Sequence, residues 1–246
     1  MKKQPPPCGQ GTDLSTKKMI DFSSVDLNYE KFRELARNPH LTPEEKIAFP
    51  VSYRQGYEDS IVRDITAKLG LESRTGQTVI DIGCGVGGVT DRLIEICRKQ
   101  KHRLVLVDSG EMLALLPDHP FISKIAGMYP SNAEAVHAAA GGEATAILCY
   151  SVLQYIFVDA NPFSFLDSLM GLLAPGGSAL IGDIPNISKR KRFFSSQTGV
   201  AFHKAFMKTE EPPAVRFNVT ETGQIDDSVL MGMVLRARTA GCDAWL

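Results

Sequence analysis

Apolar residues recur at helical spacing before the first predicted strand. One face of the segment 52–70 is apolar and consists of Ile61, Val62, Ile65 and Leu69. Gly70 follows this face, where a helix commonly ends. The stretch LTPEEK upstream places Thr42 at an N-cap and Glu45 three residues later, which predicts a capping box. We therefore expect residues 26–72 to form a helical cap that precedes the first strand.

From residue 77 onward, short apolar runs alternate with amphipathic segments. The predicted strands are 78–82, 103–108, 122–128, 144–150 and 178–184, with a sixth beginning at 243–246. Helical patterns occupy the intervals, for example 163–173 and 228–241. Apolar strands alternating with helices predict a mostly parallel sheet covered on both faces. The fold class is therefore doubly wound α/β, with a ligand site at the carboxyl ends of the strands.

Two segments fall outside this alternation. Residues 1–25 are polar and rich in Pro, Gly and Ser, which predicts a mobile N-terminal arm. Residues 186–227 form a long insertion after the fifth strand, and a connection of that length is either functional or has structure of its own. We interpret it as a lid within a single domain that spans residues 26–246.

Composition narrows the functional classes. The 27 basic and 28 acidic side chains nearly cancel, which argues against nucleic acid as a partner bound by bulk charge. Five cysteines without a CxxC pair favour a reducing, cytoplasmic setting. No apolar stretch approaches the roughly 18 residues of a membrane span, and the histidines form no metal-ligand pattern. We expect no metal and no membrane partner.

A glycine-rich turn follows the first predicted strand. Gly83, Gly85 and Gly88 satisfy the GxGxxG pattern, and Asp108 ends the second strand 20 residues after Gly88. Both features also occur in dinucleotide enzymes. Asp81 distinguishes the two classes, because a carboxylate beside the turn repels a pyrophosphate. It suits a ligand with a cationic centre and an ammonium group, such as S-adenosylmethionine.

Four motifs in order strengthen this interpretation. They are DIGCGVGG, VDSGEML, ILCYSVLQYI and LLAPGGSALIGD, which together span roughly residues 75–185. With these motifs the chain resembles the class I S-adenosylmethionine-dependent methyltransferases. The resemblance implies a Rossmann-like methyltransferase fold, S-adenosyl-L-methionine as cofactor and methyl transfer as activity.

The resemblance also implies roles for residues around the turn. Gly83, Gly85 and Gly87 would pack against the methionine part of the cofactor, with Cys84 as a small filler between them. Asp81 would hold the amino group, and Asp108 would accept from both ribose hydroxyls. The alternatives are helix–strand packing for Gly87 and capping of the next helix for Asp108.

The adenine contacts depart from the family pattern. Ser109 and Met112 would border the base. An aspartate often follows the glycine after strand three in the family, but Met128 stands there in this sequence. Met128 and Tyr129 would pack on the adenine face, leaving Asn132 or a backbone carbonyl to accept from the amino group.

The acceptor side has several candidates. Tyr150 and Ser151 would border the methionine end of the cofactor, and Tyr155 would face the acceptor or else be a half-buried helix residue. Asp183 closes strand five and would orient a hydroxyl or cap the next turn. Arg54 would meet the cofactor carboxylate. The [D/N]PP[Y/F] motif of amino-methylating DNA enzymes is absent, which argues against exocyclic nucleobase amines.

The predicted lid carries charge and one histidine. Lys189 to Arg192 are four consecutive cations, followed by two phenylalanines. They would meet an anionic acceptor such as a nucleotide-linked sugar; a solvated basic loop and RNA binding are the alternatives. His203 is the general-base candidate by residue type, against an ordinary surface histidine.

The leading hypothesis is therefore a methyltransferase acting on a small molecule, at an oxygen of a sugar-like or anionic acceptor. A catalytically inactive protein with the same fold, serving as a binding or scaffold partner, is the second hypothesis. An NAD-dependent oxidoreductase is the third.

Overall fold

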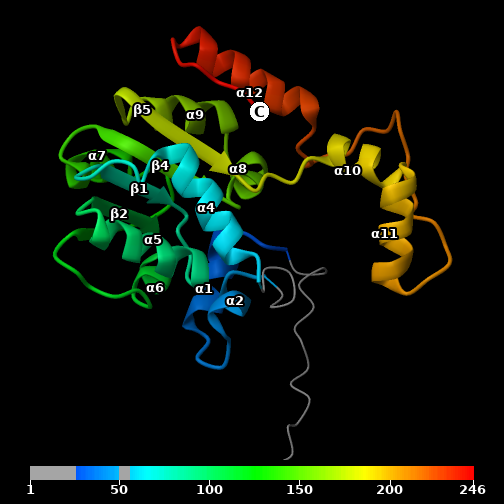
Figure 1. Ribbon diagram of the computed structural model, residues 1–246, viewed down its shortest axis with the longest axis horizontal. Coiled ribbons are helices and arrows are strands. Elements are labelled where there is room, and N and C mark those ends of the chain that lie inside the picture. The colour runs from blue at the N-terminus through cyan, green and yellow to red at the C-terminus, as the bar shows by residue number, and fades with distance from the viewer. Residues whose placement is uncertain (1–25, 50–55) are drawn as a thin grey trace, which may run out of the picture.

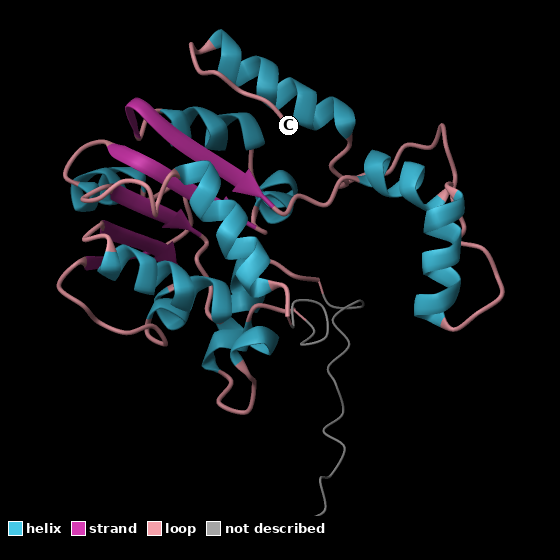
Figure 2. Cartoon of the chain, viewed as in Figure 1, coloured by secondary structure: helices cyan, strands magenta, loops and turns pink. Residues whose placement is uncertain are grey.

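The chain folds around one parallel sheet. The computed structural model describes residues 26–49 and 56–246. The sheet has the order β3-β2-β1-β4-β5, and all neighbouring strands are parallel. Its strands are β1 (Thr78–Ile82), β2 (Arg103–Asp108), β3 (Ile122–Ala126), β4 (Ala144–Tyr150) and β5 (Leu173–Gly182). The order reverses direction between β1 and β4, which confirms the doubly wound fold (Figure 2).

Both faces of the sheet are covered because successive residues of a buried parallel strand point to opposite sides. In β1, Val79 packs with Ile65 and Leu93 in one apolar cluster. Ile80 packs with Phe165 in the other. These five side chains are at most 2% exposed, so the sheet is the centre of the core.

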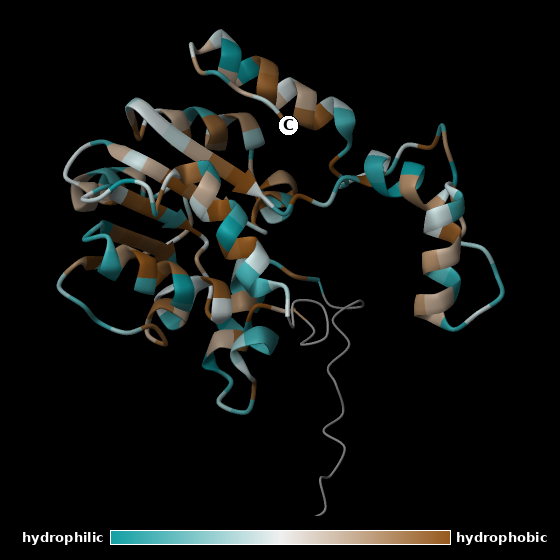
Figure 3. Ribbon diagram, in the orientation of Figure 1, coloured by the Kyte–Doolittle hydropathy of each residue, from teal (hydrophilic) through white to brown (hydrophobic). Residues whose placement is uncertain are grey.

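Helices form the two outer layers. They are α4 (Glu58–Leu69), α5 (Gly88–Lys99), α6 (Gly110–Leu113), α7 (Ala133–Ala140), α8 (Leu153–Asp159), α9 (Pro162–Met170) and α12 (Asp227–Thr239). Their charged faces point outward and their apolar faces toward the sheet (Figure 3). The predicted C-terminus of α4 is confirmed, since Gly70 adopts a left-handed conformation there. No helix in the described ranges has the length and apolar character needed to cross a bilayer.

A helical cap precedes the sheet. It consists of α1 (Tyr29–Arg37) and α2 (Pro43–Lys46). The capping box is confirmed, because the Thr42 side chain accepts from the Glu45 amide and the Glu45 side chain accepts from the Thr42 amide. Buried Lys46 donates to the carbonyls of Ala36 and Asn38 at 2.7 and 2.6 Å, which satisfies the C-terminal end of α1.

The cap is fixed to the domain at two points. Arg33 donates to both carboxylate oxygens of Glu111 on α6, at 3.0 and 2.9 Å. Phe32 meets Tyr155 of α8 edge to face, with ring centroids 5.0 Å apart. The cap therefore lies across the carboxyl ends of the strands, at the edge where the ligand site is expected (Figure 1).

The segment after β5 forms a helical arm. α10 (Ile187–Phe194) and α11 (Gln197–Met207) extend to one side of the domain and away from the cap (Figure 1). Phe193 and Phe202 join the two helices, with ring centroids 5.9 Å apart. Residues 186–227 thus have structure of their own, but they do not lie over the carboxyl ends of the strands as the predicted lid would.

Three predictions about the elements need correction or stay open. Residues 243–246 form no strand, and Arg238 instead donates to the Ala244 carbonyl at 2.8 Å. The fifth strand, predicted at 178–184, runs from Leu173 to Gly182. It begins earlier than predicted because Leu173 pairs with Ala144 ahead of a register shift. The predicted mobile arm at 1–25 and Arg54 lie outside the described residues.

Candidate functional site

Two adjoining cavities lie at the carboxyl ends of the strands. The large cavity lies between the ends of β1, β2 and β4 and helices α1 and α8, and it encloses about 1040 Å³ up to its open mouth. The small cavity lies under the turn between β1 and α5. Both are lined by Ile47, Phe49, Gly83, Cys84 and Tyr150.

The glycine turn separates the two cavities. Gly83 has a φ of +70°, and a Cβ there would come within 2.5 Å of a Val152 methyl group. Gly85 has a φ of +57°, and its Cβ would come within 2.9 Å of Ile47. Only glycine fits both the left-handed backbone and the space at these positions. The turn thus exposes backbone amides to both cavities without a side chain in the way.

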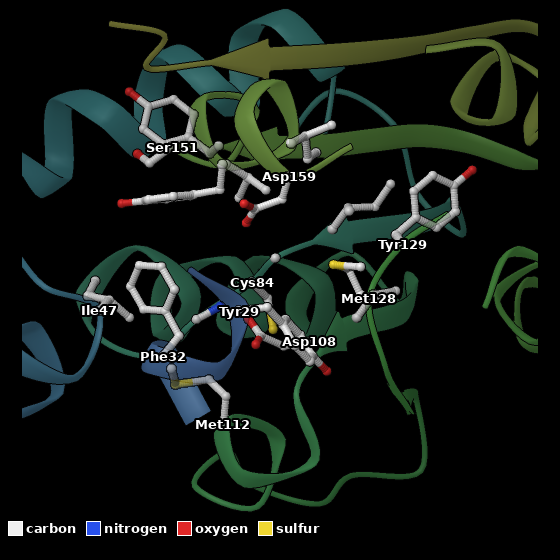
Figure 4. Close-up of a pocket in the computed structure, with 18 of the residues that line it drawn as sticks. Tyr29, Phe32, Ile47, Cys84, Asp108, Met112, Met128, Tyr129, Ser151 and Asp159 are labelled. Atoms are coloured by element: carbon white, nitrogen blue, oxygen red, sulfur yellow. Dashed lines mark hydrogen bonds between the residues drawn. The ribbon is translucent and has the colours of Figure 1, made fainter. Parts of the chain in front are cut away.

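Asp108 is held rigidly at the end of β2. Its carboxylate accepts from the Gly85 amide at 2.9 Å and from the Ser109 amide at 2.6 Å. Burial raises its pKa, and these hydrogen bonds oppose that rise. The Asp108 carboxylate lines the large cavity (Figure 4). Its geometry suits acceptance of two hydroxyls from a ribose.

Asp81 lies at the base of the small cavity. Its side chain is 4% exposed, and burial, with Asp108 as a lesser cause, raises its pKa to about 8. A buried carboxylate without a cation is costly. An ammonium group bound in the small cavity would stabilise the ionised form, which is the role predicted for Asp81.

Other predicted residues around the turn divide into two groups. Cys84 and Met112 line the large cavity, and Gly87 lines the small one. Burial, followed by the two carboxylates, raises the pKa of the Cys84 thiol, so it stays neutral. Ser109 is fully buried and does not line a cavity; its hydroxyl caps α6 by accepting from the Met112 amide at 3.2 Å.

The two residues predicted to pack on adenine, Met128 and Tyr129, both line the large cavity. Met128 is 43% exposed. The Tyr129 ring packs edge-on to Phe165, and its hydroxyl pairs with Ser168 at 2.7 Å, so most of the side chain is buried. Asn132 lies beside Gly127 of the cavity wall, and its buried Oδ1 has no hydrogen-bond partner. Asn132 itself lines neither cavity, so the predicted hydrogen bond to the adenine amino group stays a prediction.

The acceptor-side candidates are brought together in part, and His203 lies apart from them. Tyr150, Ser151 and Tyr155 line the large cavity. Asp183 does not; its carboxylate accepts from the Ser151 hydroxyl, and both residues have a positive φ at the ends of β4 and β5. His203 lies on α11, edge-on to Phe194, and is absent from the walls of both cavities because the arm extends away from them.

The residues of the large cavity that sequence reasoning missed include Tyr29, Phe32, Ile47 and Asp159. The first three come from the cap, and burial together with the charge of Asp108 raises the Tyr29 pKa. Asp159 ends α8, and its carboxylate reaches into the middle of the cavity from the wall opposite Asp108 (Figure 4). A polar residue at a helix end is so common that it gave no signal.

The site thus combines a buried carboxylate, a second carboxylate held by two backbone amides and a glycine turn between them. These groups suit the ammonium and ribose roles that the sequence predicts for Asp81 and Asp108. Residues 53–198, more than half of the chain, match the family described as "Methyltransferase domain". The protein belongs to this methyltransferase family, and its cofactor is S-adenosylmethionine.

One solved structure shares the fold at a TM-score of 0.50, and two others are similar at lower scores. The plantazolicin methyltransferase BamL, in complex with a triazolic desmethylPZN analogue and S-adenosylhomocysteine (SAH), is 17% identical over 85% of this chain and 75% of its own, with a TM-score of 0.50. The related BpumL is 15% identical over 86% and 78%, with a TM-score of 0.49. The geranyl diphosphate C-methyltransferase from Streptomyces coelicolor A3(2) is 14% identical over 82% and 67%, with a TM-score of 0.45. No curated protein matches the chain in sequence.

Proposed function

We propose that the protein transfers the methyl group of S-adenosylmethionine to a small molecule bound in the large cavity, beside the cofactor. The observation that supports this proposal is that the two cavities adjoin at the glycine turn and share five lining residues. Asp81 lines the small cavity, and Asp108 lines the large one, which also has an apolar region under α1 and α8. That apolar region lies beside the carboxylates that would hold the cofactor, and we assign it to the acceptor.

The chain contributes binding, orientation and exclusion of water. When bound, the cofactor supplies an electrophilic methyl group on a sulfonium. Asp81 holds the ammonium and Asp108 the ribose, which fixes the donor at both ends. Phe32 and Ile47 of the cap cover the cavity from above the turn. Much of the rate of a displacement of this kind comes from holding the two reactants in line.

The sequence favoured an oxygen of a sugar-like or anionic acceptor because of the basic run in the predicted lid. The contacts of that run do not support an anion site. Lys191 pairs with Glu221 at 2.5 Å and Arg192 with Asp227 at 2.5 Å. The run lies on α10, which contributes nothing to the cavity walls. We therefore propose a small-molecule acceptor without assigning it a negative charge.

Among the catalytic candidates, Tyr155 has the best geometric support, because it lines the large cavity beside Phe32. Its hydroxyl would orient the acceptor. Asp183 would act indirectly, by holding Ser151 at the end of β4. His203 has no support from its position. A general base is needed only where the acceptor keeps its proton. The absence of His203 from the cavity walls is therefore compatible with turnover.

Two alternatives predict different results. An inactive scaffold protein would bind the cofactor without turnover. An NAD-dependent enzyme would need to place a pyrophosphate beside Asp81, Glu44 and Glu58, all three of which line the small cavity. Like-charge repulsion opposes that arrangement.

The test is isothermal titration calorimetry with SAH and, separately, NADH, followed by a methylation assay on an acceptor panel. Binding of SAH but not of NADH, together with formation of a methylated product, would support the proposal. Binding of NADH instead of SAH would overturn it. Tight SAH binding without turnover across the panel would favour the scaffold alternative.

A further inference from the structure

The acceptor region of the large cavity has an unusual charge pattern. Among the lining residues that the structure describes, the charged side chains are Asp108 and Asp159, and none is a lysine, arginine or histidine. The remaining polar surface comes from tyrosine and serine hydroxyls and from backbone. A cavity of this kind repels anions and stabilises cations.

Asp159 is an exposed residue at the end of α8, and no contact with the described residues holds its carboxylate. Within the described part of the chain its carboxylate makes no hydrogen bond and no ion pair. It is also the last residue of α8, where the helix dipole disfavours a negative charge. Its position therefore does not stabilise the helix. The carboxylate instead reaches into the cavity from the wall opposite Asp108 (Figure 4).

Aromatic rings line the cavity near Asp159. Tyr155 lies one helical turn before Asp159 on α8 and meets Phe32 edge to face. Tyr29 and Phe49 add further rings from the N-terminal segment. Aromatic faces attract ammonium groups, and methylated ammonium groups most of all are recognised by such surfaces.

We infer that the acceptor is an amine with an apolar or aromatic body, and that Asp159 binds its nitrogen. This inference rests on the proposed function and names its substrate class. The amine first loses a proton to solvent at the open mouth of the cavity. The nitrogen lone pair then forms the new N–C bond while the S–C pair returns to sulfur, which becomes a neutral thioether. The product nitrogen carries the positive charge, and Asp159 with the rings stabilises it until a further proton leaves.

The experiment compares three probes of similar size on the full chain saturated with SAH: 2-phenylethylamine, 2-phenylethanol and 3-phenylpropanoate. Calorimetry should show the amine binding roughly tenfold or more tightly than the alcohol, as expected for a charge-assisted hydrogen bond, and the carboxylate binding most weakly. The Asp159→Asn variant should lose this preference and keep its affinity for SAH. Asp64→Asn changes the net charge equally at an exposed side chain of α4 that pairs with Lys68, and it should behave as the unaltered protein.

The outcomes separate this inference from the proposed function. Absence of SAH binding would overturn the proposed function. Normal SAH binding with no preference for the amine, or with tighter binding of the carboxylate, would overturn the inference alone. A preference for the amine that persists in Asp159→Asn would exclude Asp159 as the group that binds it.

Discussion

The Gly85 amide donates a hydrogen bond of 2.9 Å to the Asp108 carboxylate and so joins the turn after β1 to the end of β2. The same carboxylate also accepts from the Ser109 amide. Because a backbone amide from each of two loops bonds it, the orientation of the carboxylate is fixed. A ligand that binds Asp108 therefore finds its acceptor already oriented, and little conformational entropy is lost on binding.

Replacing Asp108 by alanine should weaken SAH binding by about 1.5–3 kcal/mol, roughly ten- to a hundredfold, because two hydrogen bonds to the ribose are lost. Calorimetry measures the change. Asp118→Ala is the matched control, since Asp118 lies on the exposed loop after α6 and is 93% exposed. Equal affinities for the Asp108 variant and the control would remove Asp108 from the ribose site.

The affinity for SAH should depend on pH through Asp81. In the free protein its pKa is about 8, so the carboxyl group is mostly protonated below that pH. Because an ammonium group requires the ionised form, affinity should rise by up to about tenfold per pH unit from about pH 6 to about pH 8. Calorimetry across this range measures the slope. Asp81→Asn should bind weakly at every pH and show no such slope.

The stability of the ligand-free protein should change with pH in the opposite sense. The folded pKa of Asp81 lies above the unfolded value of about 3.9, so the folded state binds the extra proton between these values. Its contribution to stability is therefore full below about pH 4 and is lost as the pH rises through 8. Asp81→Asn should accordingly raise the melting temperature most above about pH 8. A variant that is less stable than the unaltered protein at that pH would contradict the raised pKa.

The sheet and the positions of the two carboxylates at the site could be predicted from the sequence, because both depend on local patterns. Asp81 and Asp108 lie near the ends of apolar strands, and parallel pairing of Ile82 with Val107 brings those ends together. The direction of a side chain after a strand has no such pattern. Tyr129 borders the cavity, but its ring packs edge-on to Phe165 and is mostly buried, which the strand pattern before it does not indicate.

The sequence also did not predict where segments far apart in the chain lie relative to the cavity. The composition of residues 186–227 indicates a basic, aromatic segment, but nothing in it specifies which part of the domain it contacts. In the structure, its two helices pack on each other and its cations pair with Glu221 and Asp227. Asp159 was missed for the same reason, since only the tertiary structure brings the end of α8 over the cavity.

His203→Ala should leave the rate of methyl transfer unchanged, because His203 lies on the arm and contacts Phe194 instead of the cavity. A general base contributes on the order of 10²–10⁴ to the rate. A loss of a hundredfold or more in single-turnover measurements would therefore show that the arm reaches the site during catalysis. Tyr155→Phe, which keeps the ring beside Phe32 and removes only the hydroxyl, is the informative companion variant.

Gly83→Ala should destabilise the protein by about 2–4 kcal/mol, because it combines left-handed backbone strain with a clash against Val152. Valine is stiff at χ1, so the methyl group 2.5 Å away cannot rotate aside easily. Gly76→Ala is the matched control: Gly76 has a φ of +67° and no atom within 4 Å of the added Cβ, so it reports the strain alone, about 1–2 kcal/mol.

A second change separates strain from clash at Gly83. Val152→Ala removes the two methyl groups and leaves the Val152 Cβ 3.5 Å from the new Cβ, an ordinary contact. In a double-mutant cycle measured by urea unfolding, Gly83→Ala should cost less in the Val152→Ala background, by roughly the 1–3 kcal/mol of an overpacked contact. Additive costs would mean that the turn moves away from α8 to admit the side chain. SAH affinity would then fall in both backgrounds alike, since the moved turn no longer fits between Asp81 and Asp108.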